Sequence, residues 1–360
     1  MINMKDYILI DGSFGEGGGQ IFRTALAYSA IVQKPVKIIN IRAKRKNPGL
    51  RPQHLSALEA LAVITKAKIR GGFIGSKEVY FEPQGIYGGK FTIDPKTAGS
   101  ISLIIQAILP SLLFADKDSQ VIIKGGTDVP FAPPIDTIKF VFIPLLWRLS
   151  ADIKIEVKRR GHYPRGGGIV YLEVKPIKKP LKPIKLMEQG TIEKILGISH
   201  CVKLPKHVSE RQAKSASEVL MQNGYENLEI SIEWYPPEKD PHLGPGSGIV
   251  LWAKTNTNAL LVGDELGKRG IPAEIVGKNA AIELIKQIEG GGAVDVHNTD
   301  QLIPYMALAD GISEISSSEI SLHTLTAIYV AEKVLNARFN VEKGSEHKPS
   351  KITVKGIGYI

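Results

Sequence analysis

A glycine-rich loop near the start of the chain carries its own carboxylate. Residues 11–20 read Asp-Gly-Ser-Phe-Gly-Glu-Gly-Gly-Gly-Gln, so that Glu16 stands among the glycines. Glycines let a phosphate approach the backbone closely, and the N–H groups at a helix start favour anions. A bare carboxylate would repel that phosphate unless a divalent cation lay between the two. The loop therefore predicts phosphate chemistry with Mg²⁺ or Mn²⁺ at Glu16.

Basic residues that could bind phosphate follow within the first fifty positions. Arg23 falls in the first turn of the helix that we expect after the loop, and residues 42–46 place four cations in five positions behind a predicted strand. A basic run is often only a solvated loop, and the two interpretations are about equally supported. Because an arginine fork holds phosphate oxygens in pairs, Arg23, Arg42 and Arg45 are better candidates than the lysines.

Two polar segments near the end of the chain could complete such a site. Residues 297–304 precede an apolar run, and Asp300 could simply cap the helix that we expect there. Residues 316–326 enter another helix. If Ser321 caps it, His323 lies in the first turn, where the positive helix end keeps the imidazole a neutral nucleophile. A lone histidine near a helix start is more often a surface residue without a role.

Known nucleotide-binding motifs fit poorly. The first loop nearly matches a dinucleotide fingerprint, but Gln20 stands where the third glycine belongs and no acidic residue follows about twenty positions later. An NADP site using Arg42 remains the weaker alternative. The loops 125–134 and 160–168 can be explained by turn chemistry alone, although a proline of the first could stack on a base. The other histidines show no metal-ligand spacing.

Composition limits the class of protein. The chain has 360 residues, 43% hydrophobic content and a formal net charge of +10, which predicts a large core and favours a polyanionic partner. A single cysteine, Cys201, fits a reducing compartment. The longest apolar run, 101–115, is short for a membrane span and contains Gln106 and Pro110. We therefore expect a soluble cytoplasmic protein without membrane contact. Whether it forms a homo-oligomer is left open.

Helix-like and strand-like stretches alternate over the first 180 residues. This predicts an α+β fold with helices on one face of a sheet. The expected helices are 20–32, 52–65, 100–114 (with Pro110 kinking or shortening it) and 135–149. The expected strands are 7–10, 36–41, 79–82, 90–93, 120–124, 153–157 and 168–174, with 79–82 and 90–93 paired to each other.

A second unit is expected in the middle of the chain. Proline and lysine alternate over 175–183, which indicates a linker or an exposed edge. Residues 184–280 then contain expected strands at 192–199, 228–234 and 248–255 and a helix at 209–222; a further helix, opened by Pro272, runs to Glu289. We predict a main domain of residues 1–183 and 281–360 with a smaller α/β domain, 184–280, inserted into it.

Taken together and in this order, the motifs resemble the RNA 3′-terminal phosphate cyclase family, in its ATP-dependent archaeal form. The resemblance covers residues 7–183 and 290–340. It implies repeated βαβαββ-like units with a smaller inserted domain, an architecture related to enolpyruvyl shikimate-phosphate synthase. The matching motifs are Asp11-Gly-x-x-Gly-Glu16-Gly-Gly-Gly-Gln20-Ile-x-Arg23, Ile41-Arg42-Ala-x-Arg45, Pro48-Gly-Leu-x-x-Gln53-His54-Leu55, Gly125-Gly-Thr-Asp128, Ala132-Pro-Pro134, Tyr163-Pro-x-Gly-Gly-Gly168, Asp300-Gln301-Leu302 and His323-x-Leu-Thr326.

The resemblance also implies an activity. Such an enzyme uses ATP to convert an RNA 3′-phosphate into a 2′,3′-cyclic phosphate. His323 would take AMP from ATP, pass it to the RNA phosphate, and the neighbouring 2′-hydroxyl would then expel AMP. Glu16 would hold the metal. The RNA end phosphates would be bound by Arg23, Arg42, Arg45 and Gln53, and the adenosine pocket would be formed by Gln106, Pro133, His297, Asn298, Thr299, Asp300 and Gln301.

Two points qualify this interpretation. Relatives often have tyrosine where this chain has His297, so stacking on adenine would be weaker or made by an imidazole. One branch of the family lacks the nucleophilic histidine and serves ribosomal RNA processing. A non-catalytic RNA-binding protein of that kind is therefore the main alternative, and the presence of His323 argues against it.

Overall fold

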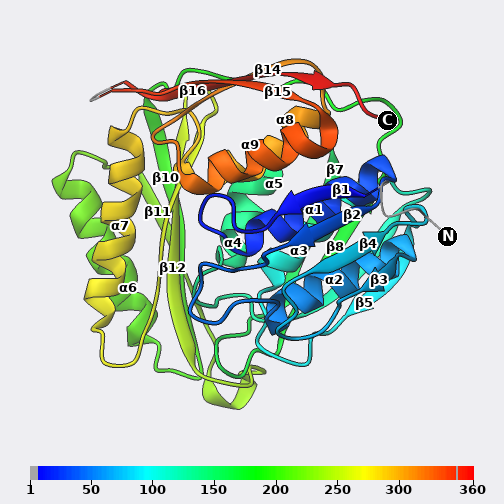
Figure 1. Ribbon diagram of the computed structural model, residues 1–360. Coiled ribbons are helices and arrows are strands. Elements are labelled where there is room, and N and C mark those ends of the chain that lie inside the picture. The colour runs from blue at the N-terminus through cyan, green and yellow to red at the C-terminus, as the bar shows by residue number, and fades with distance from the viewer. Residues whose placement is uncertain (1–6, 346–347) are drawn as a thin grey trace.

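Three copies of one βαβαββ unit form the body of the protein, and a smaller unit is inserted into the third copy (Figure 1). The structure is a computed structural model that describes residues 7–345 and 348–360. The predicted α+β class with repeated βαβαββ-like units is confirmed.

The first copy sets the pattern. Its sheet has the strand order β1-β2-β4-β3, in which β1 and β2 are parallel and the other pairs are antiparallel. The second helix begins at Pro52, which is suited to a first helical position because it has no N–H to leave unpaired. The elements are β1 (Ile8–Asp11), α1 (Gly19–Val32), β2 (Val36–Ile39), α2 (Pro52–Thr65), β3 (Lys68–Arg70) and β4 (Val79–Glu82).

The second copy repeats this topology with the order β5-β6-β8-β7. Its second helix is a composite of α4, a π-helical turn and α5. Pro110 stays within α3, which ends soon after it. The elements are β5 (Gly89–Ile93), α3 (Ile101–Leu112), β6 (Ser119–Gly125), α4 (Ile135–Thr137), η2 (Ile138–Phe142), α5 (Ile143–Arg148), β7 (Asp152–Arg159) and β8 (Gly168–Lys175).

One predicted strand pairing is wrong. Residues 79–82 and 90–93 were expected to pair with each other, but β4 pairs with β2 and β3, and β5 pairs with β6. The short connection between them joins two copies of the repeat. It therefore carries the chain from the sheet of one copy to the sheet of the next.

The third copy is interrupted after its first strand. Its sheet has the order β15-β16-β14-β9, with β9 parallel to β14 and the other pairs antiparallel. β9 is only two residues long, and the inserted unit separates it from the rest of the copy. The elements are β9 (Lys185–Leu186), α8 (Val296–Leu308), β14 (Asp310–Ser317), α9 (Leu322–Leu335), β15 (Arg338–Glu342) and β16 (Ser350–Ile357).

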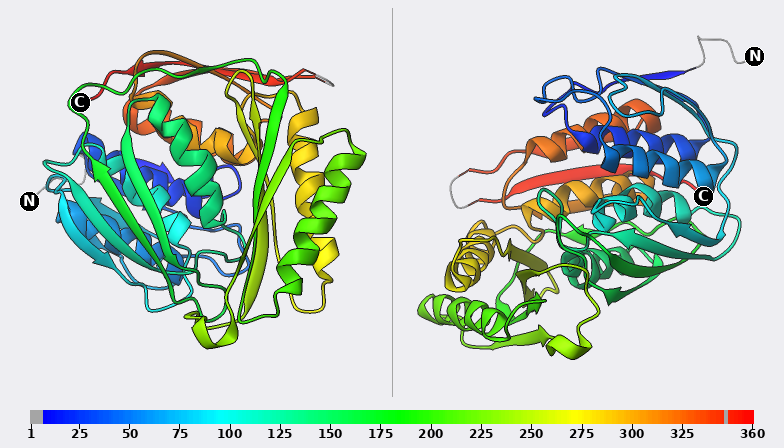
Figure 2. Two further views of the ribbon diagram at one scale, coloured as in Figure 1. Left: turned by 180° about the vertical axis from the view of Figure 1, so that it is seen from behind. Right: turned by 90° about the horizontal axis from the view of Figure 1, so that it is seen from below.

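The inserted unit is a four-stranded sheet, β11-β10-β12-β13, with α6 and α7 against it (Figure 2). Residue 280, the predicted end of the inserted domain, lies within α7, which packs on α6 and β13. The predicted division into domains stays a prediction. The elements are β10 (Ile192–Val202), α6 (His207–Gln222), β11 (Leu228–Trp234), η3 (Pro237–Lys239), β12 (Gly246–Thr255), β13 (Leu260–Leu266) and α7 (Ala273–Glu289).

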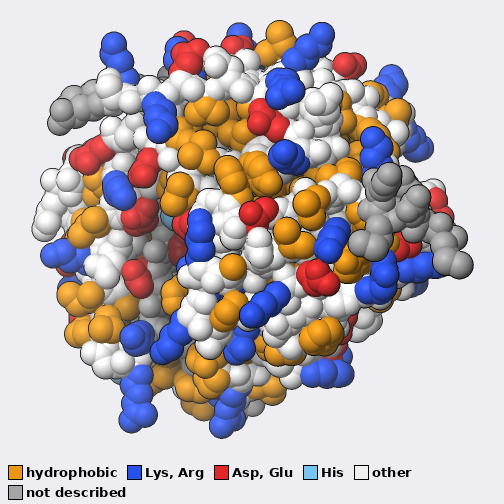
Figure 3. Space-filling model, viewed as in Figure 1, with side chains coloured by type: hydrophobic (Ala, Val, Ile, Leu, Met, Phe, Trp, Pro, Cys, Tyr) orange, Lys and Arg blue, Asp and Glu red, His pale blue; other side chains and the backbone are white. Residues whose placement is uncertain are grey.

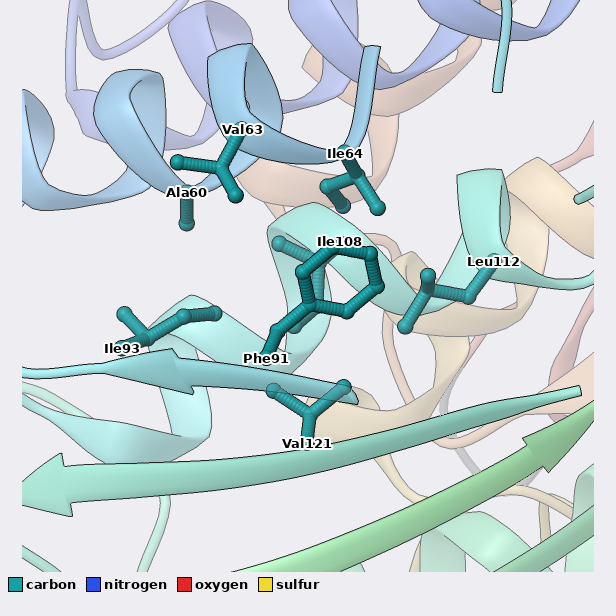
Figure 4. Close-up of a pocket in the computed structure, with 8 residues that line it drawn as sticks. All are labelled: Ala60, Val63, Ile64, Phe91, Ile93, Ile108, Leu112 and Val121. Atoms are coloured by element: carbon teal, nitrogen blue, oxygen red, sulfur yellow. The ribbon is translucent and has the colours of Figure 1, made fainter. Parts of the chain in front are cut away.

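The helices of the three copies pack against one another in the middle of the body, and the sheets lie outside them (Figures 1 and 2). α1 contacts α9 and α3, and α8 contacts α9. The apolar crevice in Figure 4, lined by side chains such as Phe91, Ile108 and Val121, belongs to this packing between layers. None of the helices described here is long and apolar enough to cross a membrane.

Candidate active site

The glycine-rich loop that follows β1 is fixed to the side of α9. The Phe14 ring stacks on Tyr329, with 4.0 Å between ring centroids. Gly15 has a φ of +60°, and a Cβ there would lie 2.3 Å from Thr326 Oγ1. Only glycine fits such a close approach in this backbone conformation. The loop at the beginning of the chain and the helix near its end therefore form one structure.

This contact brings Glu16 to His323. Ser321 caps α9, because its Oγ accepts a hydrogen bond from the Thr324 N–H at 3.1 Å, and His323 lies in the first turn, both as predicted. The His323 side chain is half exposed, and its Nε2 lies 3.3 Å from Glu16 Oε2. Partial burial lowers the pKa of His323, although Glu16 acts in the opposite direction. The imidazole is therefore neutral near pH 7 and has a lone pair to offer.

The other ring nitrogen of His323 is held by Gln20. Nδ1 of His323 lies 2.8 Å from Oε1 of Gln20, and Nε2 of Gln20 donates a hydrogen bond to the Asp300 carboxylate. An amide whose N–H faces a carboxylate presents its oxygen on the other side. That oxygen accepts a hydrogen bond from Nδ1–H, so that the lone pair of the neutral ring is on Nε2, beside Glu16.

Asp300 has a different structural position from the one predicted. The expectation that it could cap the helix is wrong: Asp295 is the N-cap of α8, accepting the N–H groups of His297 and Asn298 at 2.9 Å, and Asp300 lies within the helix. The helix begins earlier than the apolar pattern indicated. Burial raises the pKa of Asp300 to about 7, although the hydrogen bond from Gln20 and the positive charge of Arg23 both act to lower it.

The arginines predicted to bind phosphate lie around the same loop but in different environments. Arg45 is exposed, and its Nη2 lies 2.9 Å from Glu16 Oε2. Arg23 is buried, and burial lowers its pKa to about 10, so that it stays charged at neutral pH. Arg42 donates to the carbonyl groups of Asn47 and Gly49 at 2.6 and 3.0 Å. Two of the three therefore lie beside the loop, and Arg42 shapes the basic segment.

His54 lies beneath the start of α1, a position that the sequence did not indicate. Its Nδ1 accepts the Arg51 N–H at 3.2 Å, and burial lowers its pKa to about 3. A Cβ on Gly19 would lie 2.1 Å from His54 Nε2 and 2.9 Å from Arg23 Nη1. Gly19 thus leaves room for an imidazole and a guanidinium directly below the loop. Gln53, the residue before His54 in α2, is exposed.

The residues predicted to bind adenosine fall into two groups. His297 is exposed, and Gln301 is partly exposed on the same helix. Asn298 and Thr299 are buried, and their side chains bond to Asp295: Asn298 Nδ2 to Oδ2 at 2.8 Å and Thr299 Oγ1 to the carbonyl at 2.8 Å. These two bonds stabilise the first turn of α8.

The other two predicted adenosine contacts come from the second copy. Gln106 is partly buried in α3, which contacts α8. Pro133 is partly buried in the loop between β6 and α4. Among the described residues, no hydrogen bond or ion pair links either side chain to His323. Their place in the adenosine pocket stays a prediction.

Gln20 is the functional candidate that the sequence reasoning left without a role. The sequence did contain a signal for Gln20. This residue stands where a dinucleotide fingerprint has its third glycine, and a larger side chain at that position indicates a local role. Its partners, His323 and Asp300, are about 300 positions away. Such distant contacts cannot be found from spacing along the chain.

Basic side chains are spread across the face of the molecule that carries this site rather than gathered in one stripe (Figure 3). The same face includes the loop with Lys44, whose Nζ donates to the Gly15 carbonyl at 3.1 Å. A positively charged side chain therefore contacts the glycine-rich loop itself. Such a surface favours association with polyanions.

Comparison with known proteins places the chain in a family. The sequence model described as RNA 3′-terminal phosphate cyclase matches residues 14–341. Proteins named RNA 3′-terminal phosphate cyclase from Ignicoccus hospitalis and Staphylothermus marinus are 51% and 52% identical to it; the alignments cover 97% and 98% of this chain and 99% of each relative. The protein of that name from Methanopyrus kandleri is 46% identical over 98% of this chain and 99% of its own length. With matches over nearly its whole length, the chain belongs to the RNA 3′-terminal phosphate cyclase family.

Proposed function

We propose that the protein is an ATP-dependent RNA 3′-terminal phosphate cyclase that works through a covalent histidine–AMP intermediate. The observation that supports this most is the position of His323: half exposed, neutral, 3.3 Å from Glu16 and oriented by Gln20. A nucleophilic imidazole needs a free lone pair and a fixed direction of attack. Both conditions are met at Nε2.

In the first step of the proposed reaction, Nε2 of His323 attacks the α-phosphorus of ATP. The bond from phosphorus to the β-phosphate oxygen breaks, and pyrophosphate leaves. Positive charge develops on the ring, and the Gln20 carbonyl oxygen stabilises it through the Nδ1 proton. A neutral starting ring suits this step, because a protonated Nε2 has no lone pair.

The second and third steps move AMP and close the ring. An oxygen of the RNA 3′-phosphate attacks the α-phosphorus, and the bond to His323 breaks. The RNA 2′-hydroxyl then attacks the 3′-phosphorus, AMP leaves, and the hydroxyl proton passes to solvent. Arg45 offers an exposed guanidinium fork that can hold the RNA phosphate near His323, and Arg23, buried below the loop, would add its positive charge; Arg42 and the exposed Gln53 would supply further contacts.

The carboxylate of Glu16 fits a divalent cation bound together with ATP. Magnesium in phosphoryl-transfer sites uses one or two carboxylates and completes its ligands with phosphate oxygens and water. Glu16 supplies one carboxylate, partly exposed, next to Arg45 and His323. Such a cation would offset charge on the triphosphate. The adenosine would lie toward α8, near His297, Asp300 and Gln301, with Gln106 and Pro133 from the second copy. Asn298 and Thr299 would support this surface from within α8.

Label transfer from ATP tests this proposal. With ATP labelled at the α-phosphate, we expect the protein to acquire label in a bond that acid cleaves and alkali does not, as for a phosphoramidate. His323→Ala should remove the label. His207→Ala is the matched control, because His207 is an exposed histidine at the start of α6 in the inserted unit. Normal labelling of His323→Ala would contradict the proposed nucleophile.

The same experiment separates the catalytic proposal from its main alternative. A non-catalytic RNA-binding relative would bind RNA in a salt-dependent manner but would acquire no label from ATP. The cyclase should also convert an RNA ending in a 3′-phosphate to the cyclic product, and leave a 3′-hydroxyl end unchanged. We expect this reaction to take place in the cytoplasm.

A further inference from the structure

A second cluster of polar side chains lies buried where the inserted unit meets the second copy of the repeat. Asp128 follows β6, His162 follows β7, and His200 lies in β10 of the inserted unit. All three are buried, with exposures of 2%, 7% and 0%. One candidate ligand atom from each residue lies within 4.8 Å of the others, and His200 Nε2 is 3.8 Å from Asp128 Oδ1.

The atoms that face one another in this cluster lack hydrogen-bond partners. Within the part of the chain that the structure describes, Asp128 Oδ1, His162 Nε2 and both ring nitrogens of His200 are buried and unpaired. A buried polar atom is normally paired, and each exception calls for a cause. Here the unpaired atoms belong to three residues that each bring one candidate ligand atom within 4.8 Å of the others.

The remaining oxygen of Asp128 is already held from the other side. Oδ2 of Asp128 accepts hydrogen bonds from Thr127 Oγ1 at 2.6 Å and from Arg160 Nη1 at 3.3 Å. This leaves Oδ1 directed away from those partners. A metal-binding carboxylate commonly has its second oxygen fixed in this way by neighbouring donors.

The balance of formal charges around the cluster favours a bound cation. The Arg160 guanidinium is shared by three carboxylates, those of Asp128, Asp136 and Glu233, the last two at 2.7 Å. At formal charges, two buried acids and the partly exposed Glu233 face one buried base. A divalent ion would balance the excess. An excess of charge in a low-dielectric interior is otherwise strongly unfavourable.

We propose that Asp128, His162 and His200 bind a zinc ion that joins the inserted unit to the body. Two imidazoles and a carboxylate are ordinary zinc ligands, and the fourth position would be filled by water. The backbone is already arranged for this: Asp128 and His162 form an isolated parallel bridge. Gly246, at the start of β12, leaves space for the His162 ring, since a Cβ there would lie 2.0 Å from His162 Cγ.

The site is distinct from the proposed catalytic cation at Glu16. The Glu16 carboxylate is partly exposed at the first loop and lies beside Arg45, whereas this cluster is buried and nitrogen-rich. A hard ion such as Mg²⁺ prefers oxygen ligands, and zinc accepts imidazole nitrogen. The zinc ion would therefore act on the stability of the contact between the two units rather than on the reaction.

Metal analysis of the whole protein tests the proposal. The protein is produced without a histidine tag in medium that contains zinc, and is then dialysed against buffer. The metals that remain bound are identified and quantified by elemental mass spectrometry. We expect about one equivalent of zinc per chain. His200→Gln and Asp128→Asn should lose it, and His207→Gln, with its exposed imidazole, should keep it. Zinc in the wild type that persists equally in His200→Gln would overturn the assignment.

A second measurement does not depend on the folding of the variants. Wild-type protein treated with a strong chelator should melt at a lower temperature, and added Zn²⁺ should restore the original value. Co²⁺ added to the chelated protein should give the visible absorption of a site with nitrogen and oxygen ligands. The proposal fails if the wild type holds no stoichiometric metal and neither ion shifts the melting temperature. Stoichiometric manganese or iron in place of zinc would also overturn it. All these readouts are independent of adenylation, so that failure here leaves the proposed function intact.

Discussion

Nδ1 of His323 lies 2.8 Å from Oε1 of Gln20, a contact between residues 303 positions apart. The amide of Gln20 is itself oriented by Asp300. This chain of contacts decides which imidazole nitrogen is free. The proposed chemistry therefore depends on a residue that touches neither ATP nor RNA in the proposed reaction.

Gln20→Leu removes the oxygen that faces Nδ1 while keeping a side chain of similar size. A hydrogen bond to a developing charge is worth about 1.5 to 3 kcal/mol, so we expect label transfer to slow roughly 10- to 100-fold. The measurement is the single-turnover rate of protein labelling at saturating ATP. The KM for ATP should change little. An unchanged rate would show that Gln20 does not orient the ring.

The pH dependence of labelling should report Asp300. Because burial raises its pKa to about 7, Asp300 is a carboxylate above that pH and a neutral acid below it. The carboxylate accepts the Gln20 amide N–H strongly and so turns the amide oxygen toward His323, whereas the neutral acid is a weaker acceptor and carries an O–H that can donate to the amide oxygen instead. The labelling rate should thus rise as pH increases through about 7. His323 itself, with its pKa below 6.5, should limit the rate only at lower pH.

Asp300→Asn provides the control for this profile. An asparagine oxygen accepts the same N–H at every pH, so the step near pH 7 should disappear and the step below pH 6.5 should remain. If the two proteins give profiles with the same midpoint, Asp300 is not the titrating group.

Glu16→Gln should weaken the binding of the divalent metal that labelling requires. The amide keeps the size of the side chain but removes the charge that a cation would neutralise. We expect the Mg²⁺ concentration for half-maximal labelling to rise, measured by titration at constant ATP. Glu59→Gln, which changes an exposed carboxylate on α2, is the matched control and should leave the titration unchanged. An unaltered midpoint in Glu16→Gln would place the metal elsewhere.

Arg45→Ala should reduce the preference for RNA that ends in a 3′-phosphate. A lost charge-assisted hydrogen bond of about 1.5 to 3 kcal/mol corresponds to a roughly 10-fold or greater loss of affinity. Lys46→Ala, one residue further in the same exposed run, should weaken binding to phosphorylated and hydroxyl ends alike. Fluorescence anisotropy with the two RNA ends distinguishes the cases. Equal effects of both variants would mean that Arg45 acts only as a general surface charge.

Gly19→Ala should disturb the base of the site. The added methyl group would meet His54 Nε2 at 2.1 Å, and overpacking of this kind costs about 1 to 3 kcal/mol. Urea unfolding measures the loss. Gly99→Ala should have a smaller effect, because the nearest atom to its Cβ would be Thr97 Oγ1 at 3.3 Å, a mildly tight contact with a side chain. Replacing His54 by alanine in the Gly19→Ala background should recover part of the stability, and its failure to do so would place the strain elsewhere.

Local patterns in the sequence predicted several elements well. α2 has its predicted bounds because Pro52 opens it, and Ser321 caps α9 as expected. The family and the α+β class are confirmed by the matches and the sheets. In each case the information lies in consecutive residues: a cap, a proline, or an ordered set of motifs.

The parts that could not be predicted depend on contacts between distant segments. β9 consists of two residues, and only its pairing with β14 makes it a strand. Asp295 rather than Asp300 caps α8 because the helix begins before its apolar pattern does. The histidines of the buried cluster lie on separate strands and turns, so spacing along the chain gave no metal signature. These features are set by the packing of the repeats.

The interruption of the third repeat has a consequence for biosynthesis. Its opening strand leaves the ribosome before the whole inserted unit, and its partner strand and the helix with His323 emerge near the end of translation. Glu16 and Gln20 are therefore synthesised with the first repeat, well before the proposed nucleophile His323 that they contact. If the proposed mechanism holds, a nascent or prematurely terminated chain can contain all three arginines proposed to bind phosphate and still be unable to consume ATP.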